Sequence, residues 1–387
     1  MRKSGSRLRV TAQLINADDG YHLWADRYDR EIEMRDLFDL QDEIAVAVLE
    51  ALKVNLPGSE RAQVFRHRTA NVNAHELYLK GRFHLFRMTQ SGIETGLGLL
   101  EQAIEADSSY ALAHVGVAHA YRMFGPSLEM PPAEVGPKAI AAARQAVQID
   151  DTLAEARAVL AFNTFWYEWT WDVAERHFKR ALELDPNSAD THWMYAHLPS
   201  TMGRHAEALA AIARARAIDP LSGLINAMEG QFLLHAGHVD EAIMRLREAI
   251  DLDPSSRIAH LFTASAYIEN GRFDDAIAEA AAARRLTPIN TQGRALEAYA
   301  HARLDNRPAA VGALNELLEL SKHRFVSPYH IAIIYSGLGE LDLAVSWLER
   351  GYEVRDPKMV FVKADPKWNV LRRLPRFVAL LNKMNLG

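Results

Sequence analysis

Residues 237–270 read GHVDEAIMRLREAIDLDPSSRIAHLFTASAYIEN, and residues 271–304 read GRFDDAIAEAAAARRLTPINTQGRALEAYAHARL. Both segments have Gly first, Ala sixth and Pro eighteenth, so the pattern recurs every 34 residues. The same interval separates six alanines along the chain: Ala174, Ala208, Ala242, Ala276, Ala310 and Ala344. A strict period of this length, with small residues and Pro at fixed phases, is typical of a helix–turn–helix repeat array. The sequence therefore predicts an all-α solenoid in which each unit packs mainly against its neighbours.

Each unit carries its own stop and turn signals. The segment Asp185-Pro186-Asn187-Ser188 ends one helix and can cap the next, because Pro cannot continue a helix and Asn or Ser accepts hydrogen bonds at a helix start. Gly203 and its equivalents occupy the turn inside each unit, where a positive φ costs glycine little. Following the phase predicts eight units, which end at Ser108, Asp151, Pro186, Pro220, Pro254, Pro288, Lys322 and Asp356. The second unit is nine residues too long, and we expect the excess in a Pro/Gly-rich loop between residues 125 and 137.

These residues resemble the tetratricopeptide repeat, in which Gly, Tyr, Ala and Pro recur at set positions. Gly230 and Tyr267 match its early positions, although Ala replaces Gly at the eighth position of several units. The resemblance implies a superhelix of about eight helix pairs. We therefore expect a repeat array over residues 74–356, C-terminal capping helices over 357–387, and a separate N-terminal part over 1–58.

The N-terminal part reads as a short β-hairpin followed by a helix. Residues 8–14 alternate between apolar and polar side chains, residues 21–30 read as a second strand, and residues 37–52 have the apolar spacing of a helix that ends near Pro57-Gly58. The stretch from Arg7 to Arg30 resembles the end of the TolB-like domain of bacterial signalling proteins. In that family it precedes tetratricopeptide repeats, often behind a nucleotide cyclase, kinase or winged-helix domain. Residues 1–58 are therefore expected to be an incomplete remnant, whose open strand edge allows self-association.

Composition and motifs argue against several function classes. The net charge of −6 disfavours a nucleic-acid partner. The chain has no run of 18 apolar residues, so we expect no membrane partner either. The chain has no cysteine and none of the motifs GxGxxG, GxxxxGK[ST], HExxH or GxSxG, so we expect neither catalysis nor a cofactor. The 16 histidines lack the spacing of a metal site. With no secretory signal behind its basic start, the chain is expected to be cytoplasmic.

The resemblance also implies where a partner binds. The inward-facing positions of the family fall on Phe162, Phe165, Trp166, Trp193, His197, Gln231, Leu234, His235, Tyr299, Arg303 and Tyr329. This groove is aromatic and apolar, and it lacks the Lys and Asn with which some repeats clamp a terminal carboxylate. We expect it to bind an extended or helical protein segment mainly by burial. Trp169 and Trp171 are interpreted instead as packing under a turn, with Trp169 in the slot that Gly occupies elsewhere.

Two functions from different classes follow. The first is a non-catalytic protein-interaction scaffold that binds a partner segment in its concave groove. The second is the regulatory or sensory arm of a bacterial nucleotide cyclase or other signalling protein whose effector domain is missing from this chain.

Overall fold

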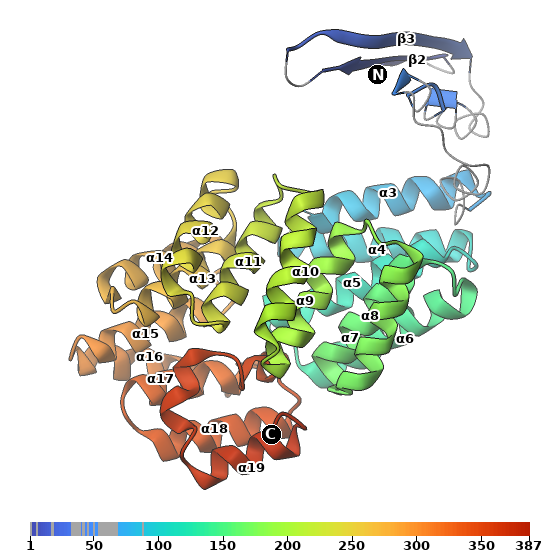
Figure 1. The fold of residues 1–387 in the computed structure, drawn as a ribbon. Coiled ribbons are helices and arrows are strands. Elements are labelled where there is room, and N and C mark those ends of the chain that lie inside the picture. The colour runs from blue at the N-terminus through green and yellow to red at the C-terminus, as the bar shows by residue number, and fades with distance from the viewer. Residues whose placement is uncertain are drawn as a thin grey trace.

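The computed structural model describes residues 2–4, 7–16, 19–31, 40, 43–44, 46–48, 51–52, 69–86 and 89–387. From residue 72 onward the described chain is almost entirely helical, and a small sheet stands at the N-terminus (Figure 1). In this described part, sixteen helices form eight antiparallel pairs: α3 (Val72–Phe86) with α4 (Gln90–Ala106), α5 (Ala111–Leu128) with α6 (Pro132–Ile149), α7 (Ala154–Asn163) with α8 (Trp171–Leu184), α9 (Ala189–Met202) with α10 (His205–Ile218), α11 (Gly223–His235) with α12 (Val239–Leu252), α13 (Arg257–Glu269) with α14 (Phe273–Leu286), α15 (Gln292–Arg303) with α16 (Arg307–Leu320), and α17 (Pro328–Gly337) with α18 (Leu341–Glu353). The predicted all-α solenoid of eight helix pairs is confirmed.

The turns inside the pairs follow the predicted phase. Gly203, Gly237, Gly271 and Gly339 all have φ between 78° and 87°, the left-handed region that glycine adopts without strain. Trp169, with φ of 55°, stands one period before Gly203 and takes the same backbone conformation. It directly follows a single π-helical turn, η1 (Thr164–Glu168), which links α7 to α8.

The starts of the helices are capped as the sequence predicts. The hydroxyls of Ser188, Ser222 and Ser256 each accept a hydrogen bond from the backbone N–H three residues later. This satisfies one of the donors that a helix start leaves without an intrahelical partner. The six periodic alanines are buried with at most 1% of their surface exposed, so each second helix can lie close to the helix before it.

The nine extra residues of the second unit lengthen its two helices, and the predicted loop between residues 125 and 137 is wrong. α5 and α6 have 18 residues each, against 14 in α8 and α10, and only residues 129–131 join them. Tyr167 explains the glycines that suggested a loop. A Cβ atom on Gly125 would lie 2.5 Å from the Tyr167 hydroxyl, and one on Gly136 would lie 3.0 Å from its ring. Glycine is present here because an aromatic ring packs against both helices.

The N-terminal sheet has strand order β1 (Arg2–Ser4), β2 (Arg7–Ile15), β3 (His22–Glu31), and both pairings are antiparallel. The two predicted strands are confirmed, and β1 is a third strand that the sequence pattern did not indicate. Tyr28 is buried against Leu40, and Ile44 packs beside them. Part of the helix predicted over residues 37–52, and its end at residues 57–58, lie outside the described residues. Self-association through this sheet stays a prediction.

After α18 the chain turns back across the array. Two 3-10 helices, η2 (Pro357–Phe361) and η3 (Pro366–Leu371), precede the last helix, α19 (Pro375–Lys383). α19 packs on α18, whereas η2 contacts α5 and η1, and η3 contacts α17. The Trp171 Nε1–H donates a 2.8 Å hydrogen bond to the carbonyl of Met384. The C-terminal segment therefore reaches from the last helix pair to the second and third pairs, in addition to covering α18.

Contacts at the end of α5 join early and late parts of the array. Glu129 is buried and accepts two hydrogen bonds of 2.7 Å from the backbone N–H and hydroxyl of Thr291. Arg324 lies 3.2 Å from its other carboxylate oxygen. Although burial opposes ionisation, hydrogen bonds from His330 and Thr291 hold the pKa of Glu129 below its ordinary value. These contacts bridge sequence separations of 162 to 201 residues and close the array on itself.

Candidate functional site

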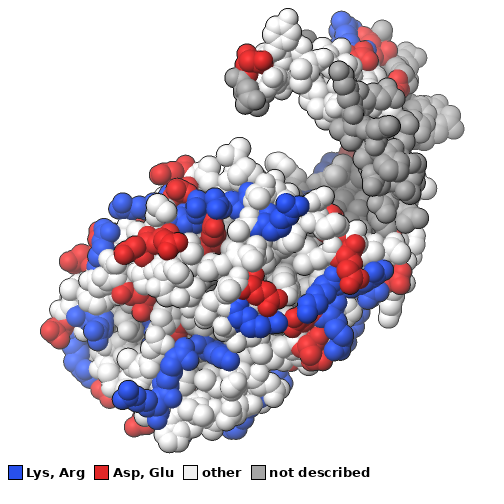
Figure 2. All heavy atoms as spheres, viewed as in Figure 1, with Lys and Arg blue, Asp and Glu red and all other residues white. Residues whose placement is uncertain are grey.

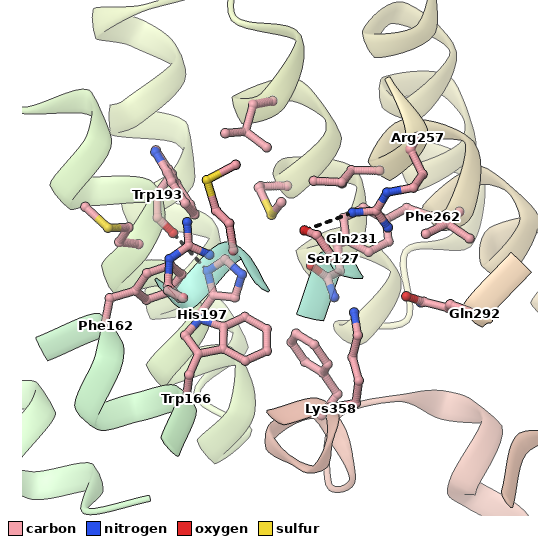
Figure 3. A pocket seen from close by; sticks show the side chains of 18 of the residues that line it. Ser127, Phe162, Trp166, Trp193, His197, Gln231, Arg257, Phe262, Gln292 and Lys358 are labelled. Carbon is pink, nitrogen blue, oxygen red and sulfur yellow. Dashed lines mark hydrogen bonds between the residues drawn. The ribbon is translucent and has the colours of Figure 1, made fainter. Parts of the chain in front are cut away.

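The closed array surrounds a cavity of about 250 Å³ (Figure 3). Its lining residues come from the first helix of every pair, from α3 to α17, together with Trp166 of η1 and four residues of the C-terminal segment. First helices line a concave face because the periodic alanines place the second helices behind them. The cavity is therefore the interior of the solenoid.

The structure brings together most of the residues predicted for the groove. Eight of the eleven line the cavity: Phe162, Trp166, Trp193, His197, Gln231, Leu234, His235 and Tyr329. The other three do not. Phe165 is fully buried behind the lining, where its ring lies 5.6 Å from that of Trp171. Tyr299 and Arg303 lie at the C-terminal end of α15, outside the lining, and Tyr299 packs on Gly337.

An aromatic cluster forms one side of the cavity, around His197 (Figure 3). The His197 ring lies 5.2 Å from Phe162 and 5.7 Å from Trp193, both in edge-to-face geometry, and 6.1 Å from Trp166. Its Nδ1 donates to the Trp193 carbonyl at 3.2 Å, because a carbonyl can only accept. Burial lowers the pKa of His197 to about 3, so the ring is neutral near pH 7. The cluster offers flat apolar surface with fixed ring orientations.

The C-terminal segment, which the sequence predicted only as capping helices, forms another side of the cavity. The Phe361 ring lies 5.5 Å from Trp166 and 5.7 Å from His235. Asp365 pairs with Lys367 at 3.0 Å and accepts a 2.9 Å hydrogen bond from the Tyr329 hydroxyl. Sequence reasoning missed these residues because the segment follows the last repeat and was interpreted only as an end cap.

The charged residues that line the cavity are five cations, Arg82, Arg122, Arg257, Lys358 and Lys367, and three carboxylates, Glu155, Asp190 and Asp365. Two of the carboxylates have close partners. Asp365 pairs with Lys367, and Asp190 accepts a 2.9 Å hydrogen bond from the Trp193 Nε1–H. Burial raises the pKa of Glu155, and the charge of Arg82 opposes that shift. The cavity therefore has an excess of positive groups, although the whole chain has a net charge of −6.

Three of these cations have no carboxylate within ion-pair distance among the described residues. They are Arg122, Arg257 and Lys358. Burial lowers the pKa of Arg122 and of Arg257 to about 10 each, and burial followed by the charge of Arg257 lowers the pKa of Lys358 to about 8. All three therefore carry a proton near pH 7. The sequence analysis did not select them, because the long second unit obscured the phase of Arg122 and Lys358 lies beyond the repeats.

The outer surface has a different charge pattern. Lys and Arg side chains alternate with Asp and Glu over the face shown in Figure 2. Exposed pairs of opposite charge occur on the outer surface, such as Arg176 with Asp172 at 2.8 Å. Within the described residues, no cluster of three His, Asp or Glu is arranged to hold a metal ion, and no helix is long and apolar enough to cross a membrane.

Comparison with known proteins agrees with the repeat geometry. Two family models, each described as a tetratricopeptide repeat, match residues 170–231 and 227–291. The chain contains tetratricopeptide repeats. A repeat array of this kind implies a protein-interaction scaffold.

The relatives of this repeat protein add one functional hint and confirm the fold. The chain is 30% identical over 118 residues to "Putative adenylate cyclase 3" of Rhizobium meliloti (strain 1021), a match that spans 30% of this chain and only 20% of that protein. Two solved structures are similar in fold. The APC/C hetero-tetramer Cut9-Hcn1 has a TM-score of 0.54 at 17% identity, covering 81% of this chain and 55% of that one. The human IFIT1 dimer with PPP-AAAA has a TM-score of 0.53 at 18% identity, covering 74% and 73%.

Proposed function

We propose that this chain is a non-catalytic scaffold that holds a segment of a partner protein on the concave side of its repeats. The observation that carries the proposal is the single cavity into which eight of the eleven predicted groove residues converge. Aromatic side chains that are already ordered lose little entropy on binding, and such groups anchor interfaces.

The size of the cavity limits how the partner enters. About 250 Å³ holds a large side chain or a pair of small ones, whereas a whole helix needs far more room. The partner segment therefore lies at the mouth and inserts an anchor residue between Trp166 and the rings around His197. Because η2 and η3 already occupy part of the concave face, the segment that binds is short.

The chain has no cysteine, so a cysteine placed in the cavity can be modified alone. Gln292 is half-buried and lines the cavity, and Glu241 is exposed on α12. A partner captured from the native host by the unmodified chain should be lost after Gln292→Cys is alkylated with a bulky maleimide. The alkylated Glu241→Cys variant should retain it. Equal retention by both alkylated variants would contradict binding in the cavity.

A second candidate function rests on the similarity to the cyclase. We propose, as the alternative, that the chain acts as the regulatory arm of a nucleotide cyclase or related signalling protein, since 118 residues are 30% identical to that relative. Sequencing the transcript upstream of the Met1 codon tests this. An effector domain in frame, or a cyclase that copurifies with the chain, supports the arm. An in-frame stop codon combined with no copurifying effector contradicts it.

The domain boundaries are part of the same proposal. Residues 74–356 form the interaction array, residues 357–387 are its C-terminal capping helices and also line the cavity, and residues 1–58 are a remnant of a TolB-like domain. The antiparallel pairing of β2 with β3, and the small core of Tyr28 and Leu40, support a separate N-terminal part.

A further inference from the structure

We propose that the cavity binds a small organic anion, with a single carboxylate or phosphate group held by Arg257 and Lys358, and an apolar body packed against the aromatic cluster, where Arg122 adds positive charge. The inference rests on the cavity alone. It goes beyond the proposed function, because such a ligand binds without any partner protein.

The unpaired cations are the first argument. Arg257 Nη2 donates to the Ser127 hydroxyl at 3.3 Å, and the guanidinium of Arg122 lies 5.1 Å from the centre of the Phe162 ring. Neither contact supplies a negative charge. The charges of Glu129 and Asp356 act on Arg257 and Lys358 from beyond ion-pair distance, because Thr291 and Arg324 engage Glu129 and Ser327 engages Asp356. Holding a half-buried cation without a close counter-charge is costly, and the repulsion between Arg257 and Lys358 adds to that cost. An anion at this site relieves both costs.

The three cations line one cavity, and their charges affect neighbouring groups within it. Arg257 and Lys358 extend toward the cavity from opposite sides, one from α13 and the other from η2 (Figure 3). The charge of Arg257 lowers the pKa of Lys358, and the charges of Arg122 and Lys358 both lower the pKa of His197. Each cation is therefore within electrostatic range of another or of the same ring. Since the three come from separate parts of the chain, the closed array is what places them together.

The carboxylates of the cavity do not neutralise this group. Asp365 is engaged by Lys367 and the Tyr329 hydroxyl, and the charge of Asp190 acts on Arg82. The charge of Glu155 acts on Arg82 as well. An incoming anion therefore meets cations whose charge is still available.

Further polar atoms of the lining also lack partners. Within the described residues, the Trp166 Nε1, the Arg122 Nε and the side-chain oxygens of Gln231 and Gln292 are buried without a hydrogen bond. Buried polar atoms in folded proteins are nearly always paired, so unpaired ones that converge on a cavity indicate a missing ligand or water. The two N–H groups suit an anionic oxygen, and the amides suit a polar substituent on the ligand body.

The dimensions favour a small molecule over a protein chain. Pockets for drug-sized ligands measure roughly 300–1,000 Å³, and this cavity is about 250 Å³. The C-terminal segment adds Lys358 and Phe361 to the lining and so covers the concave face where a longer chain would lie. A compact molecule with one aromatic ring and one anionic group matches both the volume and the lining.

Calorimetric titration of the purified full chain tests this with a matched pair of probes. The probes are 3-phenylpropionate and its neutral amide, 3-phenylpropanamide, which differ in charge and hardly in shape. We expect the acid to bind at least about tenfold more tightly, because hydrogen bonds to charged groups contribute more than neutral ones. Equal affinities for the acid and the amide, or no binding of the acid, would overturn the proposal.

Substitutions of the cavity cations test which side chains bind the anionic group. Arg257→Gln and Lys358→Met should each weaken binding of the acid about tenfold or more and leave binding of the amide unchanged. Arg285→Gln, which removes an exposed cation on α14, is the control and should bind both probes like the unaltered chain. The melting temperature of each ligand-free variant is measured as well, because each variant removes the repulsion between Arg257 and Lys358 together with the attraction of Glu129. Full affinity for the acid in both cavity variants would refute the assignment.

A third comparison distinguishes two sources of the bound anionic group, a small molecule and the C-terminal carboxylate of a protein. The probe is the tripeptide Ala-Ala-Phe with a free terminal carboxylate. Binding of 3-phenylpropionate at least as tight as that of the tripeptide supports the small anion. Binding of the tripeptide alone would overturn it and favour a protein carboxylate. Partner capture by the scaffold is measured separately, so either proposal can fail while the other stands.

Discussion

Replacing Gly230 with alanine should disrupt the contact between α11 and α12. Gly230 lies in the middle of α11 and faces Leu246 of α12. A Cβ atom added there would lie 2.7 Å from Leu246 Cδ2 and closer still to Cγ. Leu246 is fully buried, so its side chain has no free space into which it can rotate. One of the two helices must therefore move.

The size of the effect follows from two opposing contributions. Alanine in a helix interior is favoured over glycine by about 1 kcal/mol. Overpacking a close-packed core costs about 1–3 kcal/mol. Gly312 is a matched control, because it is an exposed residue of α16 and a Cβ atom there has no neighbour within 4 Å. Gly312→Ala receives only the first contribution, so Gly230→Ala should be less stable than Gly312→Ala by about 1–3 kcal/mol.

Urea unfolding followed by circular dichroism measures this difference. Because a repeat array need not unfold in one step, midpoints are compared only where the slopes agree. Adding Leu246→Ala removes the atoms that clash, so Gly230→Ala should no longer be destabilising in that background. Equal stabilities for the Gly230 and Gly312 variants, or an unchanged penalty in the double variant, would refute the packing argument.

Three further predictions concern the repeat phase, the buried histidines and the closure of the array. Ala242→Leu should lose about 1–3 kcal/mol by overpacking, and Glu241→Leu on the exposed side of the same helix should be nearly neutral; equal melting temperatures would contradict the phase. Burial lowers the pKa of His197 to about 3 and of His235 to about 4, below the value of 6.5 for an exposed histidine. Below pH 6.5 the unfolded chain therefore binds more protons than the folded chain does. Each buried ring should lower the free energy of unfolding by about 2 kcal/mol at pH 5. A stability profile that is flat between pH 7 and 5 would be inconsistent with neutral buried rings. Glu129→Ala should lower stability by about 3 kcal/mol, because it leaves the cations around that carboxylate unpaired. It should also raise the radius of gyration measured by small-angle scattering. An unchanged radius would show that the closure of the array on itself does not depend on Glu129.

The sequence alone determined the parts of the structure that depend on residues close together in the chain. Helix starts, helix ends and turns follow from short-range chemistry, so the caps at Ser188 and its equivalents and the left-handed turn at Gly203 could be predicted. The same reasoning placed Trp169 in a turn slot, and its φ of 55° bears this out. The inward-facing positions of the first helices came from the resemblance to the tetratricopeptide repeat, and eight of the eleven residues placed there line one cavity.

One local prediction was wrong because its cause is distant in the sequence. Gly125 and Gly136 read as loop residues, yet both lie in helices that Tyr167 contacts. Glycine serves both backbone turns and close packing, and only the position of the ring distinguishes them.

Tertiary structure decided the closure of the array and the charge of its interior. Small rotations from unit to unit add up along a solenoid, so the meeting of Glu129 with Thr291 depends on every pair between them. The return of the C-terminal segment depends on the same sum. Arg122, Arg257 and Lys358 come from α5, α13 and η2, which no periodic pattern relates. A repeat specifies how each unit packs on the next, and the assembled superhelix alone brings residues from distant units into one site.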